Sequence, residues 1–405
     1  MEWKEVTLGE VSSKIGDGLH GTPQYDGDGS YYFINGNNLN CGKIIIKDDT
    51  KRVGIDEFVK NQKELNEQTL LVSINGTIGN VAKYNNEPCI LGKSACYINV
   101  IKEVDKEFIY YVLTSANFKR NITNEATGTT IKNVSLKQMR EYKFNIPCNI
   151  ADQHRIASIL SSLDRKIELN NKINADLEEM AQAIFKNWFV DFEPFKDGKF
   201  VDSELGMIPE GWKVGRLDEI ADVVGGSTPS KAKPEYYTQK GIAWLTPKDL
   251  SNHPAVYTSR GVIDITEEGY NSTSTKLMPK GTILFTSRAP IGYISIAQND
   301  ICTNQGFKSL VPKKAGTCFL YCFLKYVTPE IENKSTGSTF KEASRSLMKS
   351  LQVIMPEQKV FEEFEEIVSP LFARIESLEK ESSRLSLLRD TLLPRLMSSE
   401  LEVPE

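Results

Sequence analysis

The chain has 405 residues, of which 40% are hydrophobic and 25% charged, and its formal net charge is −5. These values are ordinary for a globular protein, and the length predicts two or three domains. No apolar run approaches the ~18 residues that a membrane span needs. The polar, acidic N-terminus does not resemble a signal peptide, so we expect a cytoplasmic protein.

Cysteine and histidine are poorly placed for a metal site. The seven cysteines are odd in number and lack CxxC spacing, and the chain has three histidines. We therefore expect buried, reduced thiols and no metal.

Charge is unevenly distributed along the chain. Residues 1–150 carry a net charge of 0 and residues 196–356 of +4, whereas residues 151–195 carry −3 and residues 357–405 carry −6. The two acidic segments would be repelled by DNA phosphates, but the negative total does not exclude DNA binding by the other two.

The first segment has mixed secondary-structure signals. Residues 44–47, 69–74 and 95–101 have the β-branched character of strands. After Asp105, apolar residues from Phe108 onward keep helical spacing. Loops rich in Gly, Ser, Thr and Asn separate these elements, which predicts a mixed α and β domain.

Residues 152–195 are predicted to form one long helix. Two seven-residue series of apolar side chains, offset by four residues, form a seam along it that is typical of a coiled coil. Asn170 and Asn174 fall on this seam, where they either fix the register with a partner helix or are merely tolerated. Residues 192–212, with Pro194 and Pro209, are predicted to be an irregular linker.

An internal repeat organises the rest of the chain. WKEVTLGEV begins at Trp3 and WKVGRLDEI at Trp212, and TGTTIK (127–132) recurs as TGSTFK (336–341), both at an offset of 209 residues. TLLVSINGTIGNVA (69–82) likewise parallels TILFTSRAPIGYIS (282–295). The second half should therefore repeat the fold of the first.

A second long helix is predicted over residues 358–397, with a break or kink at Pro370 and another kink or an end at Pro394. Its heptad seam suits antiparallel pairing with the first helix. The predicted fold class is α+β, with two tandem mixed α/β domains, two long helices in an antiparallel coiled coil, and a pseudo-twofold duplication.

Catalytic motifs are not evident. LGKS (91–94) resembles the end of a phosphate-binding loop, but Glu87 stands where that loop needs glycine. No glycine-rich cofactor loop or Asn/Asp-Pro-Pro-aromatic motif of an amino-methyltransferase is found, and there is no Pro-Pro pair. We therefore predict a non-catalytic chain. A nuclease or methyltransferase with unfamiliar motifs is the alternative.

Polar loop residues recur at corresponding places in the two halves and suit nucleic acid. Hydroxyls and lysines can contact phosphates, whereas Asn, Gln and Arg can read base edges. Each residue alone could instead be a turn former bonded to its own backbone. The candidate DNA-binding residues are Thr22, Asn35, Asn37, Asn75, Thr77, Thr127, Thr129, Thr130, Lys132, Ser227, Thr228, Thr246, Lys248, Ser287, Arg288, Asn304, Gln305, Thr336, Ser338, Thr339 and Lys341.

Several motifs in order resemble the specificity subunits of type I restriction–modification systems. They are NWFVDFEPF (187–195), GMIPEGW (206–212), LFTSRAPIG (284–292), NQGFKSL (304–310) and LRDTLLPRLMSSEL (388–401). The resemblance implies target-recognition domains at 1–150 and 196–356, the latter including the linker, and spacer helices at 151–195 and 357–405. One departure is SINGTIG in the first copy, where the commoner form of the family is similar to TSRAPIG.

The resemblance implies that each domain reads one half of a bipartite site in double-stranded DNA. It also implies two methyltransferase subunits and a motor–nuclease subunit as partners, which would hold S-adenosylmethionine, ATP and Mg. Trp188, Phe189 and Phe192 at the end of the first helix are either core residues or a docking surface for the methyltransferase. A protein–protein scaffold without DNA readout is the alternative function.

Overall fold

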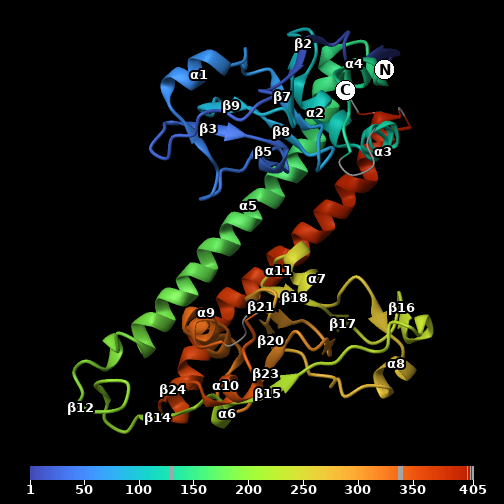
Figure 1. Ribbon diagram of the computed structural model, residues 1–405. Helices are drawn as coiled ribbons and strands as arrows, with labels where there is room; N and C mark the ends of the chain where they lie inside the picture. Colours follow the sequence, from blue (N-terminus) through green and yellow to red (C-terminus); the bar gives the residue numbers. More distant parts are fainter. Residues whose placement is uncertain (127–131, 336–340, 399, 402, 404–405) are drawn as a thin grey trace. The chain divides into compact units, whose positions relative to one another are not determined.

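The computed structural model describes residues 1–126, 132–335, 341–398, 400, 401 and 403. It forms two compact units, one of residues 1–167 with 384–405 and the other of residues 168–383 (Figure 1). The boundaries fall within the two long helices, α5 (Ile150–Phe189) and α11 (Gln358–Met397). Each unit therefore contains part of both helices, so the compact units do not coincide with segments taken in chain order.

The first unit is built on an antiparallel sheet in the order β2-β10-β7-β8 (Ser12–Asp17, Ala95–Val100, Thr69–Ser73 and Val81–Lys83). The two central strands, β10 and β7, are buried along their whole length. Leu70 and Ile98 face a core that includes helix α2 (Lys106–Thr114), whereas Leu71 and Tyr97 face a second cluster on the other side. Because side chains alternate along a strand, two covered faces explain the continuous apolar runs in the sequence.

The remaining elements of the first unit surround this sheet. The first and last strands of the unit, β1 and β11, pair with each other. The strands are β1 (Trp3–Thr7), β3 (Tyr31–Ile34), β4 (Leu39–Asn40), β5 (Lys43–Ile44), β6 (Arg52–Val53), β9 (Cys89–Leu91) and β11 (Lys143–Pro147). The helices are η1 (Gly36–Asn38), α1 (Ile55–Asn61), α3 (Ala116–Glu125) and α4 (Leu136–Glu141). The strand predicted over residues 44–47 is wrong after Ile44, because strand structure ends there.

The second unit repeats this design. Its sheet has the order β15-β23-β20-β21-β18 (Ala221–Gly225, Lys308–Pro312, Ile283–Ser287, Ile291–Ala297 and Tyr257–Thr258). Ile283 and Phe285 face a core with helix α9 (Thr317–Lys334), and Leu284 between them faces the opposite cluster. The first and last strands around the sheet, β14 (Lys213–Arg216) and β24 (Gln352–Met355), pair as β1 and β11 do. The α+β class is thus confirmed in each unit, and the repeated design confirms the duplication.

The smaller elements of the second unit flank the sheet. The strands are β12 (Phe200–Val201), β13 (Ile208–Pro209), β16 (Tyr237–Thr238), β17 (Trp244–Leu245), β19 (Asp264–Ile265) and β22 (Cys302–Thr303). The helices are η2 (Glu193–Phe195), α6 (Leu217–Ile220), η3 (Pro234–Tyr236), α7 (Pro247–Asn252), α8 (Glu267–Asn271) and α10 (Arg345–Ser350). The segment predicted to be an irregular linker contains a short hairpin, because β12 pairs with β13.

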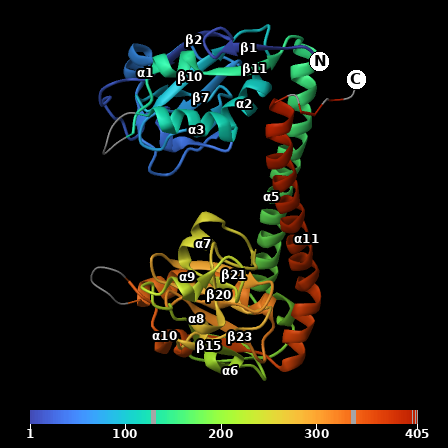
Figure 2. The same cartoon turned by 90° about the vertical axis from the view of Figure 1, so that its right-hand side faces the viewer.

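The two long helices pair antiparallel in the second unit (Figure 2). Asn170 Nδ2 donates to Glu381 Oε2 at 2.9 Å, and about five turns further along α5 the ring of Phe189 lies 5.1 Å from that of Phe364. Asn170 is completely buried and Asn174 is 8% exposed, so both lie on the seam as predicted. The bond to Glu381 supports a register role for Asn170.

The same helices also pair within the first unit. Leu160 of α5 shares a buried cluster with Leu393 and Leu396 of α11. Asp164 Oδ1 accepts from Arg389 Nη1 at 2.7 Å, and its other oxygen accepts from the Tyr111 hydroxyl. The heptad seam predicted from the sequence is therefore confirmed in both units.

Two predictions about the helix ends are wrong. Helix α5 ends at Phe189 and not at Phe195, because Phe192 adopts a left-handed conformation (φ 55°) and a short 3₁₀ turn containing Pro194 follows. Helix α11 continues through Pro370 and Pro394, so the break at Pro370 and the helix end at Pro394 are wrong, whereas the kink given as the alternative at each proline stays a prediction. Both prolines are exposed, so the carbonyl groups that they leave without a helical partner can face water.

Candidate nucleic-acid interface

Four loops of the first unit that lie far apart in the sequence are joined at the end of the sheet where β7 ends and β10 begins. Gly92 N donates to Ile34 O at 2.8 Å, and Ile74 N donates to Ser94 O at 3.0 Å. Val134 N then donates to Ile74 O at 2.9 Å. These bonds connect the segments around residues 34–38, 74–79, 92–94 and 132–134 into what we call the loop cluster.

The second unit contains an equivalent loop cluster. Asn304 N donates to Leu245 O at 2.9 Å, Ser287 N donates to Gly306 O at 2.8 Å, and Ala343 N donates to Ser287 O at 2.9 Å. The segments joined are those around residues 245–249, 287–292, 304–306 and 341–343. The predicted contact loops therefore come together in each unit, in the same order of connection.

The first loop of each cluster is held by a local cap. Asn35 N donates to Asn38 Oδ1 at 3.0 Å, and in the second unit Thr246 N donates to Asp249 Oδ2 at 2.7 Å. Such caps satisfy backbone donors at the start of a short helix. They leave the residues at corresponding positions, Asn37 and Lys248, exposed to solvent.

The predicted contact residues divide by exposure. Thr22, Asn37, Thr77, Lys132, Lys248, Gln305 and Lys341 are exposed, and intermediate exposure is found for Asn35, Asn75, Ser227, Thr228, Thr246, Arg288 and Asn304. Thr22 is not tied to the loop cluster by any contact in the described ranges, whereas the Thr228 hydroxyl donates to Gln305 Oε1. The predictions for Thr127, Thr129, Thr130, Thr336, Ser338 and Thr339 lie outside the described residues.

The DNA contact predicted for Ser287 needs correction. Its side chain is completely buried, and its hydroxyl donates to Gly306 O at 3.2 Å. A buried hydroxyl that already bonds the adjoining loop cannot reach a phosphate, so Ser287 stabilises the loop cluster and does not contact DNA. In the sequence, Ser287 lies in a polar turn, and nothing there distinguishes it from an exposed contact residue.

Two residues of the loop clusters, Glu342 and Asn133, were missed by the sequence reasoning. Glu342 Oε1 lies 3.2 Å from Lys308 Nζ and Glu342 Oε2 lies 3.4 Å from Arg288 Nη1. In the first unit, Asn133 Oδ1 accepts from Asn75 Nδ2 at 3.1 Å. Asn133 and Glu342 each follow the last lysine of the repeated TGTTIK and TGSTFK motifs, which was the available signal.

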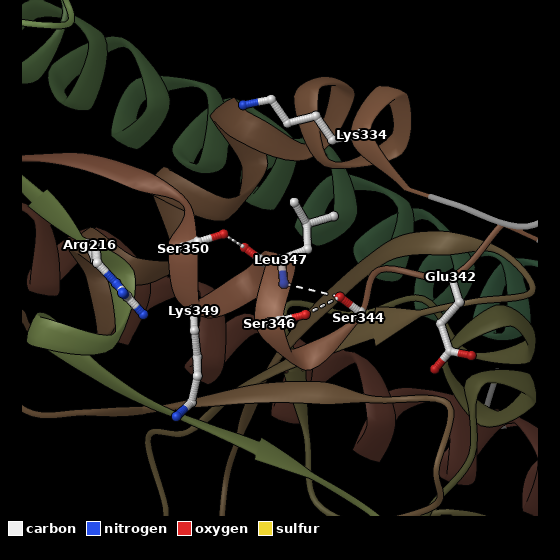
Figure 3. A pocket seen from close by; sticks show the side chains of 8 residues that line it. All are labelled: Arg216, Lys334, Glu342, Ser344, Ser346, Leu347, Lys349 and Ser350. Atoms are coloured by element: carbon white, nitrogen blue, oxygen red, sulfur yellow. Dashed lines mark hydrogen bonds between the residues drawn. The ribbon is translucent and has the colours of Figure 1, made fainter.

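A cavity of about 520 Å³ in the second unit is a further polar site (Figure 3). Arg216 already pairs with Asp218 at 2.9 Å, and Lys334 with Glu330 at 2.6 Å, so acidic neighbours offset much of its positive charge. Two of the three basic residues that line the cavity are thus paired with carboxylates, which weakens the site for phosphate. Its walls are formed by Arg216, Lys334, Glu342, Ser344, Ser346, Leu347, Lys349 and Ser350.

The aromatic residues at the end of α5 belong to the core of the second unit. Phe189 is 4% exposed and Phe192 is 9% exposed, and Trp188 packs against the same cluster while remaining partly accessible. The interpretation as core residues is thus confirmed for Phe189 and Phe192. The prediction that these two rings dock the methyltransferase is wrong, because other side chains of the core already cover them. Docking through Trp188 stays a prediction.

The cysteines are all unpaired, but not all are buried. Cys41 and Cys148 are exposed and the other five are buried. Burial raises the pKa of Cys89 to about 12 and that of Cys302 to about 11, so these thiols are poor nucleophiles at neutral pH. In the ranges that the structure describes, no group of three or more His, Cys, Asp or Glu residues could hold a metal ion. No helix in these ranges is both long and apolar enough to cross a membrane.

The family model and the related proteins that match this chain indicate the same family. Residues 1–179 and 209–386 match the model of the type I restriction modification DNA specificity domain. The MjaIX specificity subunit of Methanocaldococcus jannaschii is 39% identical over 190 residues, which are 46% of this chain and 44% of that protein. The HindI specificity subunit of Haemophilus influenzae is 26% identical over 359 residues, covering 73% of this chain and 77% of that protein.

A solved structure supports the fold. The crystal structure of the S subunit of a type I restriction-modification system from M. genitalium superposes with a TM-score of 0.58 at 21% identity. The match covers 98% of this chain and 96% of that one. At this identity the likeness concerns the fold alone, and it includes both units and both long helices.

Proposed function

Because the chain belongs to the type I restriction modification DNA specificity family, we propose that it is the sequence-recognition subunit of a restriction–modification complex. Each unit reads one half of a bipartite site in double-stranded DNA through its loop cluster. The paired helices set the gap between the halves and dock the methyltransferase subunits, with Trp188 as part of that surface.

The observation that carries this proposal is the repetition of the loop cluster. Two units with the same backbone connections but different exposed side chains, such as Asn37 against Lys248, suit two half-sites of different sequence. The helices that separate the clusters are acidic, which disfavours contact with phosphates and leaves DNA contact to the loops.

In this proposal the chain itself is non-catalytic. Two methyltransferase subunits with S-adenosylmethionine modify adenine, and a motor–nuclease subunit with ATP and Mg cleaves unmodified DNA. The complex works in the cytoplasm.

The test is coexpression with the cognate methyltransferase in a host that lacks DNA methylation, followed by sequencing for N6-methyladenine. We expect methylation at one bipartite motif, and none when this chain is omitted. Absence of a motif while the assembled complex is present would contradict the proposal.

Binding by the purified complex gives a second measurement. Specific binding should weaken as salt rises, because phosphate contacts release counterions. Binding that shows neither sequence preference nor a salt slope would instead identify a protein–protein scaffold.

A further inference from the structure

The turn that follows β7 in the first unit and the turn that follows β20 in the second share a left-handed residue at one position but differ in the side chain beside it. Gly76 (φ 74°) in the first turn corresponds to Ala289 (φ 55°) in the second, so both turns use the left-handed region at this place. In the second turn Tyr293 N donates to Thr286 Oγ1 at 2.8 Å. The first turn has the equivalent bond to a serine hydroxyl, also at 2.8 Å.

Asn75 and Arg288 occupy the same position in these two turns, immediately before the left-handed residue. Each forms an isolated β-bridge with one residue of the 132–134 or 341–343 segment, Asn133 in the first unit and Glu342 in the second. The backbone thus places the two side chains of each pair next to each other in both units.

The side chains of each pair also bind each other. Asn75 Nδ2 donates to Asn133 Oδ1 at 3.1 Å, and Arg288 Nη1 lies 3.4 Å from Glu342 Oε2. An amide pair in one unit therefore replaces an ion pair in the other. Because the β-bridge is kept while the side chains change, the pair is suited to determine a base that differs between the two half-sites.

The hydrogen-bond capacity left on each side chain matches a base edge. Arg288 is 37% exposed and uses one of its five N–H donors on Glu342, which leaves enough donors for the O6 and N7 acceptors of guanine. Asn75 keeps one amide N–H and its oxygen, which are the groups that bind N7 and N6 of adenine. Asn133 fixes which way the Asn75 amide points, and Glu342 fixes the direction of the guanidinium.

Resting on the proposed function, we propose that Asn133 and Glu342 are positioning residues for sequence readout. Glu342 orients Arg288 to specify a G·C pair in one half-site, and Asn133 orients Asn75 to specify an A·T pair in the other. The Arg288–Glu342 ion pair itself adds little stability, because its two side chains are 37% and 38% exposed.

The experiment compares variants of the full chain coexpressed with the methyltransferase, read by sequencing of N6-methyladenine. Glu342→Gln and Arg288→Ala should relax the same single G·C position in one half-site, with about tenfold less discrimination at it, as expected for loss of one bidentate contact. Asn133→Ala and Asn75→Ala should relax one A·T position in the other half-site only.

Glu330→Gln is the matched control. It removes a carboxylate that pairs with Lys334 on α9 in the same unit, and it should leave the motif unchanged. Glu342→Asp, which keeps the charge, should restore most of the discrimination lost in Glu342→Gln.

Binding of the purified complex to duplexes substituted at single positions tests the same idea without methylation. A Glu342→Gln complex that weakens equally on every duplex would identify Glu342 as a structural brace and overturn the inference. A wild-type motif that stays unchanged in the Glu342 and Arg288 variants would overturn the inference while the proposed function stands. A wild-type complex without any motif would overturn both.

Discussion

Glu379 of α11 is a partly buried carboxylate whose environment makes the stability of the second unit depend on pH. It accepts hydrogen bonds from the backbone N–H groups of Val256 at 2.7 Å and Tyr257 at 3.0 Å. Burial raises the pKa of Glu379 from 4.5 to about 7, and the nearby charges of Glu178 and Glu376 add to this, against the lowering by the two N–H groups. The folded protein therefore holds a proton that the unfolded chain releases, and stability should fall as pH rises from about 4.5 to 7.

Glu379→Gln should remove this loss of stability with rising pH. The amide oxygen can accept from one of the two N–H groups, the amide nitrogen that replaces the second oxygen cannot accept from the other, and the side chain carries no charge. We expect the variant to be less stable than wild type at pH 5 because of the lost bond, and the fall in stability between pH 5 and pH 8 to be smaller than in wild type by up to about 3 kcal/mol, at 1.36 kcal/mol per pKa unit. Urea unfolding at the two pH values measures it, with Glu363→Gln, from an exposed pair with Lys359, as the control. Equal pH dependence in Glu379→Gln and wild type would refute the assignment.

Helix α11 is stabilised by its packing and not by its local sequence. Its buried face carries Phe364, Val368, Phe372 and Ile375, each at most 1% exposed, while Pro370 lies on the exposed face. Burying such side chains contributes about 1.5–3 kcal/mol each, so the four together exceed the ~3 kcal/mol that one proline costs a helix interior. This is why the sequence rule for proline failed here.

Pro370→Ala should therefore stabilise the protein. It restores a backbone donor and improves helix propensity, so we expect the free energy of unfolding to rise by about 1–3 kcal/mol. Thermal or urea unfolding measures the change. Ser369→Ala, at the neighbouring exposed position, should change it by no more than about 0.5 kcal/mol. An unchanged or lower stability of Pro370→Ala would mean that the helix bends at Pro370 to satisfy other contacts.

At the scale of the molecule, the long helices should act as a ruler for the DNA site. Removing one heptad from each helix, residues 165–171 and 382–388, shortens both by about 10 Å at 1.5 Å per residue. At ~3.4 Å per base pair this corresponds to about three base pairs. We expect the methylated motif to keep its bases and to change its gap. Altered bases with an unchanged gap would contradict the ruler.

The sequence predicted those features that local patterns encode. The heptad seam identified the buried positions Leu160 and Asn170, and the repeat identified two equivalent folds, because periodicity and self-similarity are visible in one dimension. Connections between loops have no such pattern. The bond from Gly92 to Ile34 joins segments nearly sixty residues apart, and only the folded chain shows it.

The candidate site was predicted in outline for the same reason. Composition places polar residues in loops, but it does not separate a buried hydroxyl such as Ser287 from an exposed side chain such as Thr77. Nor does it indicate that an acidic residue, Glu342, belongs beside Arg288 in a site expected to meet phosphates. Those assignments depend on three-dimensional neighbours.

The first unit is discontinuous in sequence, and this has a consequence for how the protein is made. Leu393 and Leu396 complete the core that begins at Val6, so the core contains residues that leave the ribosome only after the whole second unit has been synthesised. Domains generally fold as units during synthesis, in order of their appearance. Here the unit whose synthesis begins first cannot complete its core until the C-terminal residues are made, so part of its apolar surface stays exposed during synthesis. The nascent chain should therefore depend on chaperones for its N-terminal half, while the second unit can close before it.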